Sequence, residues 1–440
     1  MKNVLFVAYW FPPIGGAGVQ RTVKFVKYLK AFGWQPSILT VKNPSVPIYD
    51  PKQIADIPRE CKIFRAKTLE PSYSLKHNFL SKQYTSGLRK RIKRILNFMQ
   101  SIVLLPDPQI LWWPLLIFSL IRILRSDKVE CIFVSAPPFS SLVPVTLLGK
   151  LFGVPVVADY RDDWSFSRSN IENAVKTLFA RMVDDRLERF VILNCDALTV
   201  ATWSYAENIL RKFPSTRREK CYVITNGYDS SDFSGVSLKK TSSKNSLKVN
   251  FLYSGTVWKA TSLFPFVRAI NLLLRVNKEI DKKIHIRIVG RIVDHEAHYF
   301  LDPRFEGLIE LTNYIPHVDI INEMNAADVL LLSLSDLPGA NHIIPGKTFE
   351  YMATGKHILA LVPEGETKRL LIEEYGNATI VDPGKVELIS ENILKLVSNI
   401  ERLRAKREID VSRYERKALT GKLATVLSIA AKKRKSIRRI

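Results

Sequence analysis

The sequence predicts an α/β protein built from two successive Rossmann-like domains, and three observations support this. Its 440 residues exceed what one hydrophobic core usually holds and suit two domains of about 200 residues each. Short apolar runs rich in β-branched residues alternate with segments of helical period, which is typical of βαβ units with parallel sheets. The alternation stops once, at the Ser- and Lys-rich stretch 237–246, and then starts again. We therefore expect domains at 1–236 and 247–410, a linker loop at 237–246, and a C-terminal helix with a basic tail at 411–440 that packs back on the first domain.

The apolar runs are the predicted strands, and several are continuous rather than alternating, as strands buried on both faces require. In the first domain the predicted strands are residues 4–8, 36–40, 62–66, 131–135, 154–159, 197–201 and 222–225. In the second domain they are residues 249–253, 285–289, 309–314, 329–333, 358–362 and 379–381. Ligands of parallel sheets bind beyond the carboxyl ends of the strands, so the residues that follow each strand are the candidates for a site.

Composition and charge narrow the functional classes. Apolar residues make up 46% and charged residues 25% of the chain, which argues against long disorder. The four cysteines are scattered with no C-x-x-C pair, which argues against a zinc ribbon and suits the reducing cytosol. The first residues indicate a strand rather than a signal peptide, because Pro12 and Pro13 follow at once. The net charge of +24 predicts attraction to nucleic acid, an anionic bilayer or a phosphorylated substrate; the alternative is a basic surface that only keeps the protein soluble.

The loop after the first predicted strand carries glycines that a bound phosphate could approach. Gly15 and Gly16 precede a predicted amphipathic helix, whose N-terminal N–H groups suit an anion. Gly16 and Gly18 match the start of G-x-G-x-x-G, but Arg21 stands at the third glycine, so a dinucleotide site is only weakly indicated. From this loop alone, a phosphate site and a structural turn both remain open.

A charged cluster, 159–164, follows the fifth predicted strand. Arg161, Asp162 and Asp163 are costly at a strand end unless they are paired or used, which makes this loop a candidate for a cleft. The alternative is an ion pair of Arg161 with Asp159 or Asp162 that only fixes the loop. We expect no metal at the Asp162–Asp163 pair, because no further carboxylate lies nearby in the sequence.

The segment 345–350 is the sharpest candidate in the second domain. Its Gly-Lys-Thr triplet resembles the end of a P-loop, but Asn341 occupies the position of the first glycine that a P-loop requires. Instead we predict a helix that begins after the proline, with Lys347 and Thr348 in its first turn as an anion site. Glu350 follows one turn later, where a carboxylate accepts hydrogen bonds from vicinal sugar hydroxyls or, alternatively, only compensates the helix dipole.

Taken together, the motifs at the predicted strand ends resemble one enzyme family over nearly the whole chain. They are Phe11-Pro12-Pro13 with Gly15-Gly16, Ser135-Ala136-Pro137-Pro138, Arg161-Asp162 with Trp164, Thr225-Asn226-Gly227-Tyr228-Asp229, Ser254-Gly255-Thr256, Ala326-Ala327-Asp328-Val329-Leu330, and Pro345-x-Lys347-x-Phe349-Glu350-Tyr351-Met352-Ala353-x-Gly355. Each motif is weak alone, but their order and placement make a strong signal. The sequence resembles the GT-B-fold glycosyltransferases of family four, especially their bacterial polysaccharide and lipopolysaccharide branch.

The resemblance implies two Rossmann-like domains whose parallel sheets face each other across a cleft. It implies a reaction that moves a sugar from a nucleotide diphosphate sugar to a glycan or lipid-linked acceptor. The acceptor would bind mainly to the first domain, near Arg161, Asp162 and Trp164, with Asp162 catalytic. Retention of the anomeric configuration and an oxocarbenium-like transition state are implied as well. No metal or other cofactor would be needed, because lysines, arginines and helix dipoles stabilise the leaving diphosphate.

The donor would be held mainly by the second domain. The donor-side residues that the resemblance implies are Gly15, Gly16, Gly255, Lys259, His342, Lys347, Thr348 and Glu350. Among them, Glu350 would hold the nucleotide ribose, and Lys347 and Glu350 would also be catalytic. Two departures leave the transferred sugar open: Thr256 stands where the family often has arginine, and His342 stands where its commonest pattern has a second glutamate.

Two basic segments are candidates for contact with an anionic membrane. Residues 88–99 form a predicted helix with an apolar stripe and a cationic face, and residues 432–440 contain no acidic side chain. The apolar run 110–121 is too short and too proline-rich for a membrane span, so we expect an interfacial or buried helix there. We expect a cytoplasmic protein, peripheral on the inner face of the membrane. The alternative is that the stripe of 88–99 packs on the first domain while its charges face water.

Two other functions stay open at this stage. A nucleotide-sugar epimerase of the same architecture would use the donor without an acceptor. A basic nucleic-acid-binding protein is disfavoured, because the sequence has no zinc finger or aromatic-basic RNA motif, and we expect no specific nucleic-acid partner.

Overall fold

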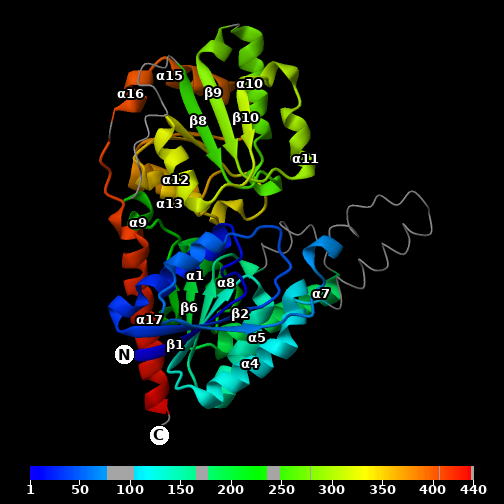
Figure 1. The fold of residues 1–440 in the computed structure, drawn as a ribbon, viewed down its shortest axis with the longest axis vertical. Coiled ribbons are helices and arrows are strands. Elements are labelled where there is room, and N and C mark those ends of the chain that lie inside the picture. Colours follow the sequence, from blue (N-terminus) through cyan, green and yellow to red (C-terminus); the bar gives the residue numbers. More distant parts are fainter. Residues whose placement is uncertain (77–103, 165–176, 235–247, 278, 406, 438–440) are drawn as a thin grey trace, which may run out of the picture. The chain divides into compact units, whose positions relative to one another are not determined.

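A computed structural model describes residues 1–76, 104–164, 177–234, 248–277, 279–405 and 407–437. The chain forms two compact units, one of Met1–Thr225 with Arg416–Ile440 and one of Asn226–Glu415 (Figure 1). Each unit contains one parallel sheet flanked by helices, so the predicted α/β class with two Rossmann-like domains is confirmed. The predicted linker 237–246 and the predicted cationic helix 88–99 lie outside the described residues.

The first unit has a seven-stranded parallel sheet in the order β3-β2-β1-β4-β5-β6-β7. Its strands are β1 (Lys2–Ala8), β2 (Trp34–Val41), β3 (Lys62–Ala66), β4 (Cys131–Ala136), β5 (Val156–Tyr160), β6 (Ala197–Val200) and β7 (Cys221–Val223). Its helices are α1 (Ala17–Tyr28), α4 (Trp113–Ser126), α5 (Leu142–Phe152), α7 (Leu178–Asn194), α8 (Trp203–Lys212) and α17 (Arg416–Ile437). The chain builds outward from β1 to β3 and then returns to β4 on the other side of β1. The loops after β1 and β4 therefore adjoin at a switch point, where such sheets bind ligands.

The second unit has a six-stranded parallel sheet in the order β10-β9-β8-β11-β12-β13. Its strands are β8 (Val249–Ser254), β9 (Ile284–Val289), β10 (Ile309–Thr312), β11 (Val329–Ser333), β12 (His357–Leu361) and β13 (Ala378–Val381). Its helices are α9 (Ser230–Phe233), α10 (Phe264–Val276), α11 (Asp294–Ala297), α12 (His317–Ala326), α13 (Lys347–Ala353), α14 (Glu366–Leu370), α15 (Val386–Val397) and α16 (Ile400–Arg404). Here the switch point lies between β8 and β11, which brings the loops that follow these two strands together.

The strands of the second sheet bury both faces, as their continuous apolar sequences require. Phe251 and Tyr253 belong to a core cluster that includes residues of α10 and α15, whereas Leu252 belongs to a second cluster with residues of α12 and α13. Successive side chains of a strand point to opposite faces, so one apolar run supplies both clusters. The two layers hold the carboxyl ends of β8 and β11 in fixed register.

The helix α17 packs on the first unit, against α1, β4 and β5. Leu419, Leu423 and Leu427 are its most deeply buried leucines. The units divide at 225/226 and 415/416, whereas the sequence placed these divisions at 236 and 410. The difference arises because the segment after β7 is bonded to the second unit: the Tyr228 N–H donates to Tyr414 O at 3.1 Å. Composition does not reveal such a contact between residues far apart in the chain.

The apolar run 110–121 lies in a helical stretch on the first unit. Leu116, Leu120 and Ile123 are buried, while Phe118 on the opposite side is 67% exposed. Within the described ranges, Pro108–Ser126 is the one helical stretch whose length and apolar composition would allow it to cross a bilayer, a test that core helices of soluble proteins also pass.

Candidate active site

In the first unit, the Gly15–Gly16 loop is fixed by its own packing. The Gly15 N–H donates to Ile48 O at 3.0 Å, and a Cβ at Gly15 would lie 2.7 Å from Ile48 Cγ2. Gly16 precedes α1 with a φ of 98°, in the region that favours glycine. The turn itself therefore explains why glycine stands at both positions, as one of the two alternatives from the sequence proposed. Whether these glycines also approach a diphosphate stays a prediction.

The charged cluster after β5 forms a different ion pair from the two that the sequence suggested. Arg21 on α1 donates to Asp159 through Nε at 3.0 Å and Nη2 at 2.8 Å, and both side chains are almost fully buried. Ser135 and Thr199 donate to the same carboxylate at 3.0 and 2.7 Å. Asp159 thus pairs with Arg21 rather than with Arg161, and its role is to hold α1 against the sheet.

Arg161 connects loops at the carboxyl end of this sheet. Its guanidinium donates to the carbonyl oxygens of Ala136 at 3.2 Å, Pro137 at 2.7 Å, and Gly18. Burial lowers the pKa of Arg161, and the neighbouring Asp162 opposes that effect. Because the side chain is 9% exposed and donates to three carbonyls, it braces the loops around the predicted acceptor side and offers an acceptor little surface.

Asp162 and Trp164 differ in what they can offer an acceptor. Burial raises the pKa of the Asp162 carboxyl, and Arg161 beside it lowers that pKa in part. The Trp164 ring is 1% exposed and stacks on Phe139 with ring centroids 4.9 Å apart. The ring therefore contributes to packing at this end of the sheet. The expected place of Trp164 on the acceptor side stays a prediction.

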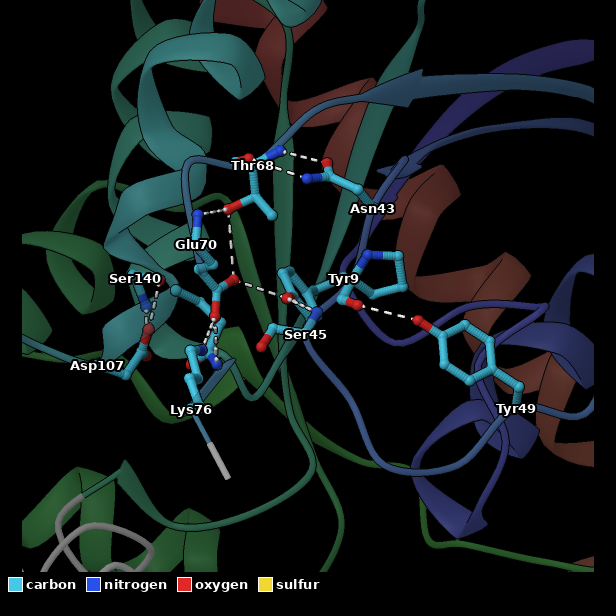
Figure 2. Close-up of polar contacts among 11 residues, drawn as sticks. Tyr9, Asn43, Ser45, Tyr49, Thr68, Glu70, Lys76, Asp107 and Ser140 are labelled. Carbon is cyan, nitrogen blue, oxygen red and sulfur yellow. Dashed lines mark hydrogen bonds and ion pairs between the residues drawn. The ribbon is translucent and has the colours of Figure 1, made fainter. Parts of the chain in front are cut away.

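A second polar network at the same end of the sheet was not anticipated from the sequence (Figure 2). The Tyr9 hydroxyl donates to Glu70 Oε1 at 2.6 Å, and Thr68 Oγ1 donates to the same oxygen at 3.3 Å. Lys76 Nζ donates to Glu70 Oε2 at 2.8 Å, and the Glu70 side chain is fully buried. Burial raises the pKa of Tyr9, and the negative charge of Glu70 raises it further. The Tyr9 hydroxyl therefore keeps its proton and donates it to the hydrogen bond. The network fixes the loops after β1 and β3 in one conformation.

In the second unit, Lys347 places a buried amine at the carboxyl ends of two adjacent strands. It is the first residue of α13, and its Nζ lies 3.7 Å from the centroid of the Tyr253 ring near the end of β8. Across the part of the chain that the structure describes, Nζ is inaccessible and has no hydrogen-bond partner. Burial lowers the pKa of Lys347 to about 7, and Glu350 opposes this only in part. A desolvated cation without a hydrogen-bonded partner is costly, which marks this point as a place for an anion.

Close backbone packing and one tyrosine hold Lys347 against Gly255. A Cβ at Gly255, whose φ is 125°, would lie 3.1 Å from Lys347 Nζ. Gly290 after β9 approaches the same residue so closely that a Cβ there would lie 2.2 Å from Gly255 O. The buried Tyr351 hydroxyl accepts the Ser254 N–H at 3.0 Å and lies 3.1 Å from Ser254 Oγ. This ties α13 to the end of β8, so Lys347 and Gly255 are brought together.

Glu350 lies one turn after Lys347 and has a specific partner on another helix. His317 Nε2, at the first residue of α12, is 2.8 Å from Glu350 Oε1. The Glu350 side chain is 18% exposed. Glu350 thus has a partner beyond the helix dipole, and its contact with a ligand stays a prediction.

The other donor-side candidates differ in accessibility. Thr348 is fully buried and its N–H already donates to Pro345 O at 3.0 Å, whereas its Oγ1, like Lys347 Nζ, has no hydrogen-bond partner among the described residues. The contact of Thr348 with a phosphate stays a prediction, and it would be made through the hydroxyl rather than the N–H. Lys259 and His342 are half-buried and lie in the loops after β8 and β11, at the same edge of the sheet.

Across the described ranges, no group of three or more His, Cys, Asp or Glu side chains is arranged to hold a metal ion. Asp163, the second member of the acidic pair after β5, accepts a hydrogen bond from Asn208 Nδ2 at 3.4 Å.

Sequence reasoning did not find Tyr253, Tyr351 or His317. Tyr253 stands beside Ser254 near the end of β8, and Tyr351 follows Glu350 in α13, so the only local signal of each was an aromatic side chain beside a quoted residue. His317 had no local signal, because it lies 33 residues before its partner.

Comparison with known proteins agrees with this architecture. Residues 14–232 match the family model described as Glycosyltransferase Family 4, and residues 248–399 match the one described as Glycosyl transferases group 1. No curated protein matches the chain in sequence.

Solved structures with the same fold cover almost the whole chain. Sucrose-phosphate synthase from Thermosynechococcus elongatus is 13% identical with a TM-score of 0.61, over 100% of this chain and 99% of that one. Anabaena HepE in complex with UDP and glucose is 12% identical with a TM-score of 0.58, over 100% of both chains. UDP-GlcNAc 2-epimerase from Methanocaldococcus jannaschii is 11% identical with a TM-score of 0.54, over 97% of this chain and 99% of that one. At these identities the likeness concerns the fold alone.

Proposed function

Because the chain belongs to the GT-B-fold glycosyltransferases of family four and group 1, we propose that it transfers a sugar from a nucleotide diphosphate sugar to a glycan or lipid-linked acceptor in surface polysaccharide or lipopolysaccharide synthesis. The observation that carries the proposal is the Lys347 amine. It is buried beside Gly255 without a hydrogen-bond partner among the described residues, and a diphosphate would supply the missing negative charge. Glu350, one turn further along α13, would receive the ribose hydroxyls of the same nucleotide.

The reaction breaks the bond between the anomeric carbon and the diphosphate oxygen, and the electron pair leaves with the diphosphate. The acceptor oxygen bonds to the anomeric carbon, and its proton passes to the departing phosphate. We propose retention of configuration through an oxocarbenium-like transition state. Lys347 stabilises the charge that develops on the diphosphate, which is the role that a metal ion has in other transferases, so the proposed mechanism needs no metal. Asp162 acts on the acceptor side in the first unit.

Structures of the same fold suggest UDP as the first nucleotide to test. Anabaena HepE has been solved with UDP-glucose, and TarM of S. aureus with UDP.

We also propose that the protein is cytoplasmic and peripheral on the inner face of the membrane, where a lipid-linked acceptor would be available. Residues 88–99 and the tail 432–440 are the proposed contacts. Arg434 at the end of α17 is paired with Asp196 at 3.1 Å, so this charge of the tail is engaged within the first unit.

Calorimetry against UDP-, GDP-, ADP- and CMP-sugars tests the donor proposal, because a bound donor releases heat and stabilises the protein by mass action. Lys347→Met should abolish measurable binding. Lys356→Met is the matched control, because Lys356 is another half-buried lysine of lowered pKa but lies at the amino end of β12. If no donor binds the wild type, or if both variants lose binding equally, the proposal is wrong.

The epimerase of the same fold supplies a second candidate function. The two functions differ in their products, because an epimerase inverts a stereocentre of the free nucleotide sugar and needs no acceptor. Incubation with labelled donor, with and without a membrane lipid extract, separates the two. Label that moves into lipid supports transfer, and a changed free nucleotide sugar without lipid supports epimerisation.

A further inference from the structure

His317 lies between two carboxylates that come from different helices. Its Nε2 is 2.8 Å from Glu350 Oε1 on α13, and its Nδ1 is 3.7 Å from Asp232 Oδ2 on α9. The side chains of His317, Glu350 and Asp232 are 17%, 18% and 12% exposed. Three polar groups with so little water around them interact more strongly than a surface cluster would.

The roles within this chain follow from the chemistry of the groups. An ionised carboxylate offers no proton, so His317 Nε2 is the donor to Glu350. A hydrogen bond to a charged group is stronger and more directional than a neutral one. On the other side of the ring, Asp232 supplies a negative charge 3.7 Å from Nδ1. The imidazole is therefore held in one orientation, and it holds the Glu350 carboxylate in turn.

The backbone around the cluster is fixed independently. Pro316 O accepts the N–H groups of Asp319 and Ile320 at 3.0 and 3.2 Å, which starts α12 at His317. The Asp232 N–H donates to Asp229 O at 3.0 Å, and α9 packs against α12. The contact between His317 and Glu350 is thus made between two helices rather than by a loop.

We propose that His317, held by Asp232, is a positioning residue that orients Glu350 to bind the ribose hydroxyls of the donor nucleotide. The inference rests on the proposed function, because it assigns Glu350 to the ribose. It adds a specificity: the oriented carboxylate distinguishes a ribonucleotide from a 2′-deoxyribonucleotide, which lacks one of the two vicinal hydroxyls. Without His317 the Glu350 carboxylate can rotate, and its hydrogen bond with the second ribose hydroxyl no longer contributes to nucleotide binding.

The test compares UDP, GDP and ADP with their 2′-deoxy counterparts by calorimetry, using whichever pair binds. In the wild type the ribonucleotide should bind about tenfold or more tightly than the deoxynucleotide, since one hydrogen bond to a charged group is at stake. His317→Phe should bring that ratio close to one by weakening the ribonucleotide alone. His317→Gln should preserve most of it, because the amide can donate from nearly the same position, and Asp232→Asn should give an intermediate ratio.

Two controls separate a positioning role from a general loss of structure. His295→Phe changes an exposed histidine on α11, 66% exposed, and should keep the wild-type ratio. Lys347→Met should abolish measurable binding of the ribonucleotide and the deoxynucleotide alike, because the diphosphate is common to them. If His317→Phe fails to fold, the Gln and Asn variants still give the ordered series.

Each failure has a distinct meaning. If His317→Phe keeps the wild-type ratio while Glu350→Ala abolishes it, the positioning role is wrong and the proposed function stands. If the wild type binds ribo- and deoxynucleotides equally, Glu350 does not hold the ribose, and the inference is wrong. If the wild type binds none of the nucleotides, the proposed function itself fails and the inference fails with it.

Discussion

Replacing Lys347 by methionine removes a charge that the folded protein desolvates, so the variant should be more stable than the wild type when no donor is present. Burial lowers the pKa of Lys347 to about 7 from its usual 10.5, with partial opposition from Glu350. Methionine has similar length and no charge, and it fits beside the Tyr253 ring that Lys347 now contacts.

The sign and size of the effect follow from proton linkage. The unfolded chain keeps the Lys347 proton up to pH 10.5, whereas the folded protein keeps it only up to about pH 7. The destabilisation is therefore fully present below pH 7 and is relieved as the pH rises from 7 to 10.5. At about 1.4 kcal/mol per pH unit, the difference in the free energy of unfolding is at most about 4 kcal/mol at pH 7 and about 2 kcal/mol at pH 9.

Urea unfolding of the donor-free protein at pH 7 and pH 9 measures this difference. Lys347→Met should unfold at higher urea than the wild type, by more at pH 7 than at pH 9. Lys282→Met, at an exposed lysine paired with Glu279, should show no gain at either pH. Saturating donor should stabilise the wild type and leave Lys347→Met almost unchanged. A Lys347→Met protein that is no more stable than the wild type at pH 7 would refute the idea that the site holds a strained cation awaiting a diphosphate.

Four further outcomes are expected. Glu350→Ala should keep the fold but lower kcat/KM for donor by about 100-fold, through the loss of charge-assisted bonds of about 1.5–3 kcal/mol each; normal turnover at low donor concentration would contradict this. Asp162→Asn should reduce transfer while leaving the calorimetric affinity for donor unchanged, and an equal loss of affinity would remove Asp162 from the acceptor side. EDTA should leave transfer unchanged, and restoration of a lost activity by Mg²⁺ or Mn²⁺ would show that a metal is required. Replacing Arg91, Lys93 and Arg94 together with Glu should release the protein from anionic liposomes at low salt without changing its melting temperature, since each charge contributes about 1 kcal/mol; undiminished sedimentation with liposomes would point to the tail 432–440 instead.

The strands were predictable from the sequence, because strands buried on both faces leave continuous apolar runs. Within the candidate site, the sequence placed Lys347 at the start of a helix and Glu350 one turn in, and the structure confirms that local arrangement. Binding of a common ligand by these two residues stays a prediction. The partners of these residues were not predictable, because Tyr253 and His317 reach them only through sheet order and helix packing. Trp164 was placed on the acceptor side through the family resemblance, and the sequence did not reveal that its ring is 1% exposed.

The path of the chain through its two units sets the order in which the protein can mature. The second unit is one continuous segment, so it can complete its core as soon as residue 415 has left the ribosome. The first unit cannot, because α17, which covers α1, β4 and β5, is synthesised after the whole of the second unit. Until then, the apolar surface that Leu423 and Leu427 cover stays open to water or to a chaperone. The half that begins synthesis first is therefore the half that becomes native last.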